Sequence, residues 1–154
     1  MEGVHGRRGD RPRPGGRTTL FAGSAARREG FRVCDGRRRW HRDAATAGVL
    51  TGAGRSLAVG AERAGVYAVR AADGSQAWGR HIEGGPDAPR TVAAGETVYA
   101  RASDQVLALD LNGRERWTAP LGHSAGDDRH TPVVRGRRLC IPSGTGVAAV
   151  DITR

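Results

Sequence analysis

Four side chains in one segment have residue types and a spacing that could bind a divalent metal ion. They are His123, Asp127, Asp128 and His130. Imidazole nitrogen and carboxylate oxygen are common ligands of such ions. A solvated polar loop has the same composition, and the segment is an insertion relative to the equivalent connection after Trp78. We therefore expect a loop here, with a weak metal site as the alternative.

Motifs for nucleophilic, phosphate or zinc chemistry are missing from the sequence. Cys34 and Cys140 lie far apart without a CxxC partner, so they indicate neither a disulfide framework nor a cysteine zinc site. The sequence contains no glycine-rich phosphate loop, no GxSxG and no HExxH motif. We therefore expect no catalytic residues and no cofactor-binding residues in this chain.

The positive charge is concentrated near the N-terminus. The chain of 154 residues carries a net charge of +9, and residues 1–42 hold 12 arginines against 4 acidic side chains. The remainder holds 13 arginines against 12 acidic side chains, so its charge does not indicate nucleic-acid binding. Residues 1–18, rich in Arg, Gly and Pro, are too polar to offset the entropy cost of ordering. We expect a disordered leader there, with a phosphate-binding arm as the alternative.

Hydropathy excludes two further classes of protein. No apolar run approaches the roughly 18 to 20 residues that span a bilayer, and the first residues lack the apolar core of a secretory signal. We expect no membrane span and leave the compartment unknown, with the cytoplasm as the default. The basic residues are all arginine, which is typical of a GC-rich genome such as that of an actinobacterium.

A repeat of about 40 residues organises the rest of the chain. Trp40, Trp78 and Trp117 lie 38 and 39 residues apart, and each has a glycine four positions earlier. An Asp or Asn precedes each of these glycines, and both residue types open tight turns by bonding to their own backbone. The repeated unit is therefore a turn that leads into a strand carrying a tryptophan.

Short β-type runs recur in register with the tryptophans. They occupy residues 57–59, 66–69, 98–100, 106–110, 139–141 and 147–151. No segment shows a sustained helical period. With the tryptophan strand and a further short run before each unit, the pattern is four strands per unit, which is typical of the blades of an all-β propeller.

The sequence before each tryptophan resembles the tryptophan-docking repeat of quinoprotein-type, PQQ-like β-propellers, Ala-x-Asp-x-x-x-Gly-x-x-x-Trp. The docking positions retained in this chain are Gly36, Trp40, Ala68, Gly74, Trp78, Ala108, Asp110, Gly113 and Trp117. Arg70 stands where the family has Asp. Because that Asp ties the turn together in the family, we expect the turn of the second repeat to be weakened.

The resemblance covers residues 19–154 and implies a partial β-propeller of about three to three and a half four-stranded blades. The expected units are residues 19–46, 47–87, 88–129 and a truncated 130–154. Closing a ring takes at least about four blades, so we expect a piece of a longer gene product or a ring completed by another chain. Trp78, between two complete units, is expected to be the tryptophan most sensitive to substitution.

Members of this family are either PQQ-dependent dehydrogenases or noncatalytic repeat proteins. The enzymes hold Ca²⁺ through Glu and Asn or Asp, use an Asp base, and place a Trp beneath the quinone. Here the single asparagine, Asn112, lies in a turn and the three tryptophans take docking positions. The resemblance therefore implies a noncatalytic binding or scaffold module for a protein or small ligand. A fragment of a PQQ-dependent dehydrogenase whose active-site blades are absent is the alternative.

Overall fold

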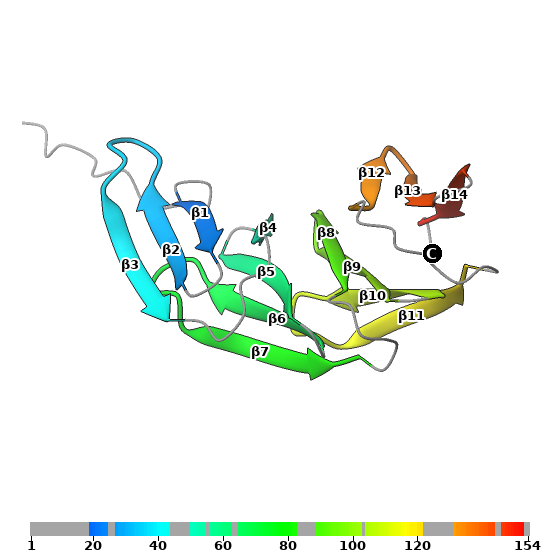
Figure 1. Ribbon diagram of the computed structural model, residues 1–154, viewed down its shortest axis with the longest axis horizontal. Helices are drawn as coiled ribbons and strands as arrows, with labels where there is room; N and C mark the ends of the chain where they lie inside the picture. Colours follow the sequence, from blue (N-terminus) through cyan, green and yellow to red (C-terminus); the bar gives the residue numbers. More distant parts are fainter. Residues whose placement is uncertain are drawn as a thin grey trace, which may run out of the picture.

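Four small antiparallel sheets follow one another along an arc (Figure 1). The computed structural model describes residues 19–24, 27–43, 50–54, 56–62, 65–82, 89–102, 104–121, 131–143 and 146–152. All regular elements of this described part are β-strands. The expectation of an all-β partial propeller is thereby confirmed. The expected leader, residues 1–18, lies outside the described residues.

Each sheet is named here as a blade. Blade 1 contains β1 (Thr19–Ser24), β2 (Arg27–Arg32) and β3 (Arg38–Asp43). Blade 2 contains β4 (Thr51–Ala53), β5 (Leu57–Glu62), β6 (Gly65–Arg70) and β7 (Gln76–His81). Blade 3 contains β8 (Arg90–Ala94), β9 (Thr97–Ala102), β10 (Gln105–Asp110) and β11 (Glu115–Pro120). Blade 4 contains β12 (Val133–Arg135), β13 (Arg138–Ser143) and β14 (Gly146–Asp151).

Strand order in space follows strand order in the chain within every blade. The strands β4, β8 and β12 lie on the concave side of the arc, and β3, β7 and β11 lie on its convex side (Figure 1). By repeat spacing, β1 is equivalent to β5 and β14 to β10. In the described residues, blade 1 therefore has no counterpart of the inner strand β4, and blade 4 has no counterpart of the outer strand β7.

The central strands of blades 2 and 3 bury both faces. Along β10, Val106 and Ala108 face the core shared with blade 4, whereas Leu107 and Leu109 face the core shared with blade 2. A strand places alternate side chains on opposite faces. A run without polar interruption is therefore what a strand needs when it lies between two neighbouring sheets.

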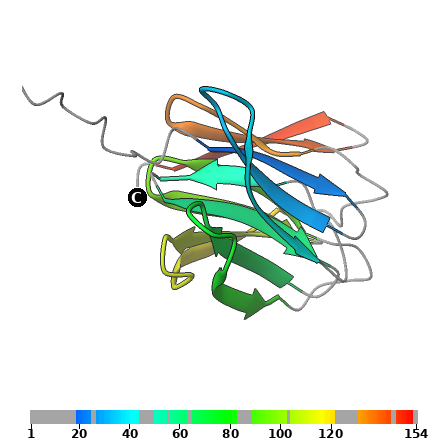
Figure 2. The same ribbon diagram turned by 90° about the vertical axis from the view of Figure 1, so that its left-hand side faces the viewer.

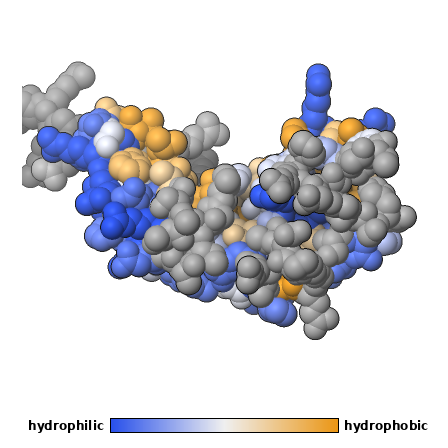
Figure 3. Space-filling view, in the orientation of Figure 1, coloured by the Kyte–Doolittle hydropathy of each residue, from blue (hydrophilic) through white to orange (hydrophobic). Residues whose placement is uncertain are grey.

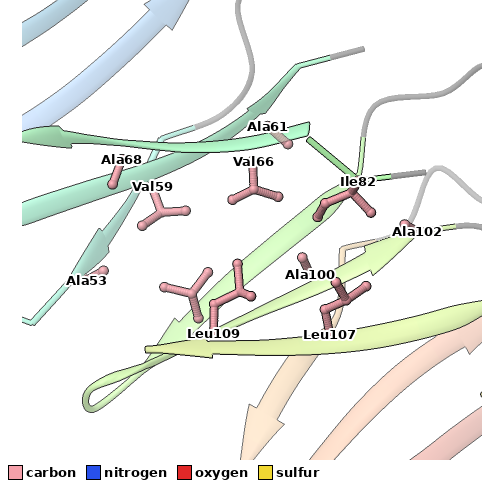
Figure 4. Close-up of a cluster of buried hydrophobic side chains, with 11 residues drawn as sticks. Ala53, Val59, Ala61, Val66, Ala68, Ile82, Ala100, Ala102, Leu107 and Leu109 are labelled. Carbon is pink, nitrogen blue, oxygen red and sulfur yellow. The ribbon is translucent and has the colours of Figure 1, made fainter. Parts of the chain in front are cut away.

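Three apolar cores join the four blades in sequence. The core between blades 2 and 3 contains Val59 and Val66 from one sheet and Ala100, Leu107 and Leu109 from the other (Figure 4). Separate clusters join blade 1 to blade 2 and blade 3 to blade 4. Figure 2 shows the same stack of sheets from the blade 1 end. At about 25 cal/mol per Å² of buried apolar area, these cores are the main source of stability.

The outward faces of the two terminal blades each expose two large hydrophobic side chains. Leu20 and Val33 belong to blade 1, and Val133 and Val147 belong to blade 4. They are the exposed large hydrophobic side chains of the described residues. Figure 3 shows hydrophobic surface at both ends of the arc. Each terminal blade thus covers one neighbour and presents its other face to the surroundings.

Candidate functional site

The tryptophan of blade 1 docks on a turn of blade 2. Trp40 lies on β3 and is 8% exposed, and its Nε1 donates a hydrogen bond of 3.0 Å to the carbonyl oxygen of Ala71. The indole lies against Gly74, where a Cβ atom would overlap the ring. Gly74 has a φ of 71°, which also favours glycine. The ring of Phe21 lies 6.2 Å from the Trp40 ring and covers it from blade 1.

Blades 2 and 3 repeat this contact. Trp78 Nε1 donates a hydrogen bond of 2.8 Å to the carbonyl oxygen of Leu111. A Cβ atom at Gly113 would lie 2.8 Å from the Trp78 ring. Both turns therefore bind an indole in the same way, with a glycine under the ring and a carbonyl that accepts from the ring nitrogen. Gly74 and Gly113 each contact the tryptophan of the preceding repeat, which lies on the neighbouring blade.

Trp117 packs between blades 3 and 4. Its ring centroid lies 5.9 Å from that of Tyr99, and the same core contains Leu139, Ile141 and Ile152. Ile152 is the counterpart of Ala71, since its N–H donates to the carbonyl of Arg137 much as that of Ala71 donates to Ser56. The third tryptophan thus lies toward the corresponding turn of blade 4.

The small residues predicted by the repeat lie beside the tryptophans within each sheet. Ala68 is opposite Trp78 in the pairing of β6 with β7, and Ala108 is opposite Trp117 in the pairing of β10 with β11. In blade 1 the equivalent position is Gly30, and a Cβ atom there would overlap the Trp40 ring. A small side chain opposite the indole lets the ring lie flat toward the neighbouring blade.

An aspartate closes the turn of blade 3. Asp110 Oδ1 accepts hydrogen bonds from the N–H groups of Asn112 at 2.8 Å and Arg114 at 2.9 Å. The N–H of Arg114 is the main cause that holds the pKa of Asp110 below its ordinary value, and the N–H of Asn112 adds to it. These two bonds join the carboxylate of Asp110 to the backbone of the turn that follows it.

The turn of blade 2 is closed by a different aspartate. Asp73 Oδ1 accepts from the N–H of Ser75 at 2.9 Å and from its hydroxyl at 2.7 Å, and these bonds lower the pKa of Asp73. Arg70 Nη1 donates to the carbonyl of Gln76 at 3.1 Å, and the turn keeps its backbone bond from Gly74 N–H to Arg70 at 2.9 Å. Asp73 thus supplies an acceptor in a turn where position 70 holds a guanidinium. The weakening expected at Arg70 stays a prediction.

A charged contact accompanies the docked Trp78. Arg80, two residues after Trp78, pairs with Glu115 of blade 3, and its Nη1 lies 3.4 Å from the carbonyl oxygen of Gly113. Arg80 thus brings a guanidinium to the turn that binds the Trp78 indole.

Two arginines between blades were missed by sequence reasoning. The Arg28 guanidinium lies 3.8 Å from the centroid of the Tyr67 ring in blade 2, and Arg28 also pairs with Glu62 at 3.6 Å. Arg101 is 4% exposed and donates through Nη1 to the carbonyl of Pro142 in blade 4 at 3.0 Å. Neither position lies in the β-type runs named from the sequence, and nothing in the sequence indicated their partners.

The predicted metal-binding segment lies outside the described residues. His123, Asp127, Asp128 and His130 all fall within residues 122–130, so their binding of a metal stays a prediction. Elsewhere, in the described part of the chain, no group of three or more His, Cys, Asp or Glu side chains could hold a metal ion. Cys34 and Cys140 are free, as their spacing indicated.

A pocket of about 560 Å³ lies where the turns of blades 2 and 3 meet. It is lined by Gly52, Gly54, Ser56, Ala93, Gly95, Glu96 and Leu111. Leu111 is also the residue whose carbonyl accepts from Trp78. The lining is small and weakly polar with one carboxylate, and it offers no acid–base pair for catalysis.

The repeated four-stranded sheets with indoles between them define a partial β-propeller of PQQ-like repeats. The chain belongs to the family of the outer membrane protein assembly factor BamB, which matches residues 9–154. No protein of curated function matches the sequence.

Solved structures show the same fold. BamB from Moraxella catarrhalis superposes with a TM-score of 0.71 and 18% identity, covering 88% of this chain and 47% of that one. The computationally designed Ika4 protein superposes at 0.65 and 14% identity, covering 88% and 86%, and the designed Ika8 protein at 0.65 and 15%, covering 88% and 43%. The chain thus spans about half the length of the BamB structure. Among the described residues, no helix is long and apolar enough to cross a membrane.

Proposed function

We propose that this chain is a noncatalytic binding or scaffold module whose partner is another protein or the remaining blades of a larger propeller. Membership of a family named for a protein assembly factor supports a partner of protein type. The observation that carries the proposal is that the repeated tryptophans Trp40 and Trp78 pack one blade against the next. The Trp40 and Trp78 indoles both donate to backbone carbonyls of the next blade.

The use of these tryptophans argues against a quinone site within this chain. A quinone floor needs an indole face open to a cofactor, whereas the faces of Trp40 and Trp78 lie against Gly74 and Gly113. Asn112 belongs to the turn closed by Asp110. The residues that the enzyme would need for its cofactor therefore serve the architecture instead.

The outward faces of blades 1 and 4 are the surfaces best suited to bind a protein. Each carries two exposed large hydrophobic residues: Leu20 and Val33, and Val133 and Val147. Exposed apolar patches on folded proteins commonly mark interaction sites. The partner would cover these faces as one blade covers the next.

Site-specific photocrosslinking tests this proposal. A photoreactive amino acid at Leu20 or Val133 should form crosslinks to a defined polypeptide in cells that produce the protein. The same group at His81, on the convex edge of the arc, serves as the control and should form few. Equal crosslinking at all three positions, or none at Leu20 and Val133, would contradict the proposal.

A titration tests whether this chain itself carries a quinone site. Purified protein should show no saturable PQQ binding at micromolar concentrations with Ca²⁺ present, and no reduction of a dye acceptor with alcohols or sugars. Calcium-dependent micromolar binding of PQQ would favour the dehydrogenase fragment. The same experiment with Zn²⁺ and the His123→Ala, His130→Ala double variant tests the predicted metal site.

A further inference from the structure

Arginine is concentrated along the outer strand of blade 1. Residues 37–42 read Arg-Arg-Arg-Trp-His-Arg, and all of them except Trp40 are exposed. The strand β3 carries three arginines, whereas the equivalent outer strands β7 and β11 carry one each. Figure 3 shows hydrophilic surface over β3, which lies on the convex side of the arc in Figure 1. This edge of blade 1, residues 37–43, is called here the arginine edge.

Most of the charge on the arginine edge has no counter-ion within the described chain. Arg38 pairs with Glu29 at 3.1 Å. No salt bridge of the described residues includes the other three arginines, Arg37, Arg39 and Arg42. Blade 1 as a whole, residues 19–43, holds seven arginines against three acidic side chains, whereas residues 90–120 of blade 3 hold four of each. Blade 1 therefore keeps a surplus of positive charge that an anionic partner would neutralise.

Like charges also face each other within the sheet of blade 1. Arg28 of β2 lies directly opposite Arg42 of β3. Two like charges in such cross-strand positions destabilise a sheet. Arg28 is held by Glu62 and by the ring of Tyr67 in blade 2, whereas Arg42 is exposed. A carboxylate bound beside Arg42 would relieve this repulsion.

The arginine edge is also an open strand edge. The strand β3 lies at one end of the order β1-β2-β3, and no strand of the described chain pairs with its outer side. Backbone N–H and C=O groups on that side can pair with one more extended strand. A polypeptide offers the matching backbone groups, whereas a nucleic acid or a lipid surface does not. The free edge and the surplus of arginine together favour an extended acidic polypeptide over other polyanions.

We propose that the arginine edge binds an extended acidic segment of another protein, which adds a strand to blade 1 beside β3. Aspartate or glutamate side chains of that segment lie opposite the arginines, because opposite charges in cross-strand positions stabilise a sheet. The backbone of the segment pairs with the outer side of β3. The inference rests on the proposed function for the class of partner, and it names the partner's chemistry at a surface distinct from the exposed side chains of Leu20 and Val33.

A second copy of this chain does not fit the same edge. Antiparallel pairing of the whole strand β3 with another β3 would set Arg39 against Arg42, which destabilises the pair. Charge on an edge strand protects proteins from such self-pairing. Protection alone is needed equally at β7 and β11, which carry fewer arginines. A strand of opposite charge is therefore the occupant that the arginine edge selects.

Binding of a labelled peptide to the unaltered full chain provides the test. The probe is a peptide of about ten residues that alternates Glu and Thr, which is longer than β3 and whose threonines favour an extended strand. Fluorescence anisotropy should show saturable binding that weakens as salt is added, because salt screens exposed charges. A peptide that alternates Gln and Thr should not bind. Equal binding of both peptides, or binding of neither, would overturn the proposal.

A triple variant assigns the binding to the arginine edge. Arg37→Gln, Arg39→Gln and Arg42→Gln together should weaken binding of the acidic peptide at least about fivefold, since they remove charges that pair with the peptide. All three side chains are exposed and lie outside the salt bridges of the described chain, so the blade should stay folded. Undiminished binding by the triple variant would overturn the proposal.

Two control variants separate the arginine edge from charge elsewhere. The first, Arg116→Gln, Arg135→Gln, Arg138→Gln, removes the same charge from exposed positions on blades 3 and 4. The second replaces the five arginines of residues 1–18 by Gln. Each should weaken binding by less than about twofold, because distant charges are screened. A loss in either control as large as that of the triple variant would overturn the proposal.

Modified probes test the strand pairing on the unaltered protein. The acidic peptide with every backbone nitrogen methylated keeps its charge but donates no backbone hydrogen bond. It should bind at least about fivefold more weakly than the unmodified peptide, and equal binding would overturn the proposal. A single-stranded oligodeoxynucleotide that binds more tightly than the peptide, and loses binding in the triple variant, would assign the edge to nucleic acid and overturn it too.

The peptide experiment and the crosslinking experiment fail separately. The peptide experiment uses no natural partner and leaves Leu20 and Val133 unchanged. Failed peptide binding would exclude the arginine edge and leave the crosslinking prediction in force. Failed crosslinking at Leu20 and Val133 would contradict the proposed function and leave the measured peptide affinities unchanged.

Discussion

The indole of Trp40 makes several contacts between blades, although the first repeat keeps only Gly36 and Trp40 of the docking positions. It contacts a glycine turn, a backbone carbonyl and the ring of Phe21. Trp78 makes the first two kinds of contact but is less buried. Burial therefore predicts that Trp40 is the more sensitive of the two, whereas the sequence alone places Trp78 first.

Substitution of the two tryptophans tests this ranking. Trp40→Ala should lower the free energy of unfolding by about 3 to 5 kcal/mol, through lost burial and the cavity that remains. Trp78→Ala should cost no more than Trp40→Ala. Urea denaturation followed by circular dichroism measures both. A loss at Trp40 of less than half the loss at Trp78 would restore the sequence-based ranking.

The glycine beneath Trp40 should be equally intolerant of change. Gly74→Ala adds a Cβ atom both at a positive φ and against the indole, so it should cost about 1 to 3 kcal/mol more than Gly136→Ala. Gly136 shares the positive φ and has no described neighbour within 4 Å. Chemical denaturation of the two variants measures the difference. Equal losses would mean that the ring moves away without cost.

Protonation of the turn aspartates Asp73 and Asp110 should lower the free energy of unfolding at acid pH, and this fall is called the acid limb of the stability curve. Hydrogen bonds lower the pKa of Asp73 and Asp110 in the folded chain below the ordinary value of 3.8. A lowered folded pKa stabilises the protein above the unfolded value, and this contribution is lost as the pH falls from about 4 toward the folded pKa. Asn keeps an acceptor oxygen without the charge. The Asp73→Asn, Asp110→Asn double variant should therefore lose less stability than the parent between pH 5 and pH 2.

Denaturant midpoints across that pH range provide the measurement. Asp104→Asn, an exposed aspartate outside the docking turns, is the control and should leave the acid limb close to that of the parent. An unchanged acid limb in the double variant would show that the two turn carboxylates do not contribute to it.

At the level of elements, the sequence predicted local features well because their causes are local. The Gly36, Gly74 and Gly113 spacing marked the turns, and uninterrupted apolar runs marked strands buried on both faces. Partners across blades were not predictable in the same way. The contact of Arg28 with Tyr67 joins residues far apart in sequence, and no local pattern records it.

The replacement of one turn aspartate by another shows why a motif mismatch can mislead. The family position is Arg70 in blade 2, yet Asp73 accepts the bonds that close the turn. Asp35 before Gly36 occupies the same place in blade 1 and likewise accepts a turn N–H. From the sequence, the Asp before Gly36 and before Gly74 is expected to open the turn. The closing of the turn is expected from the family Asp position, which is Arg70 here.

At the scale of the whole molecule, three cores join four sheets into an arc, and each of its two outward faces exposes two large hydrophobic side chains. The inner blades gain stability on both sides, whereas blades 1 and 4 gain it on one side. Exposed Val133 and Val147 on the blade 4 face therefore favour association with other molecules. Replacing both by threonine should reduce this association without loss of secondary structure, and sedimentation together with far-UV circular dichroism measures both effects. Unchanged association would move the interaction away from blade 4.

The central claim is that this arc is completed by contacts with another polypeptide, and its behaviour in isolation tests that claim most directly. The measurement is light scattering of the purified chain over a range of concentrations, combined with a thermal melt. The account predicts concentration-dependent association at micromolar levels and a melting temperature below about 60 °C. A monodisperse monomer that melts cooperatively above about 60 °C would contradict it, because such a chain would need no further blade to cover its faces.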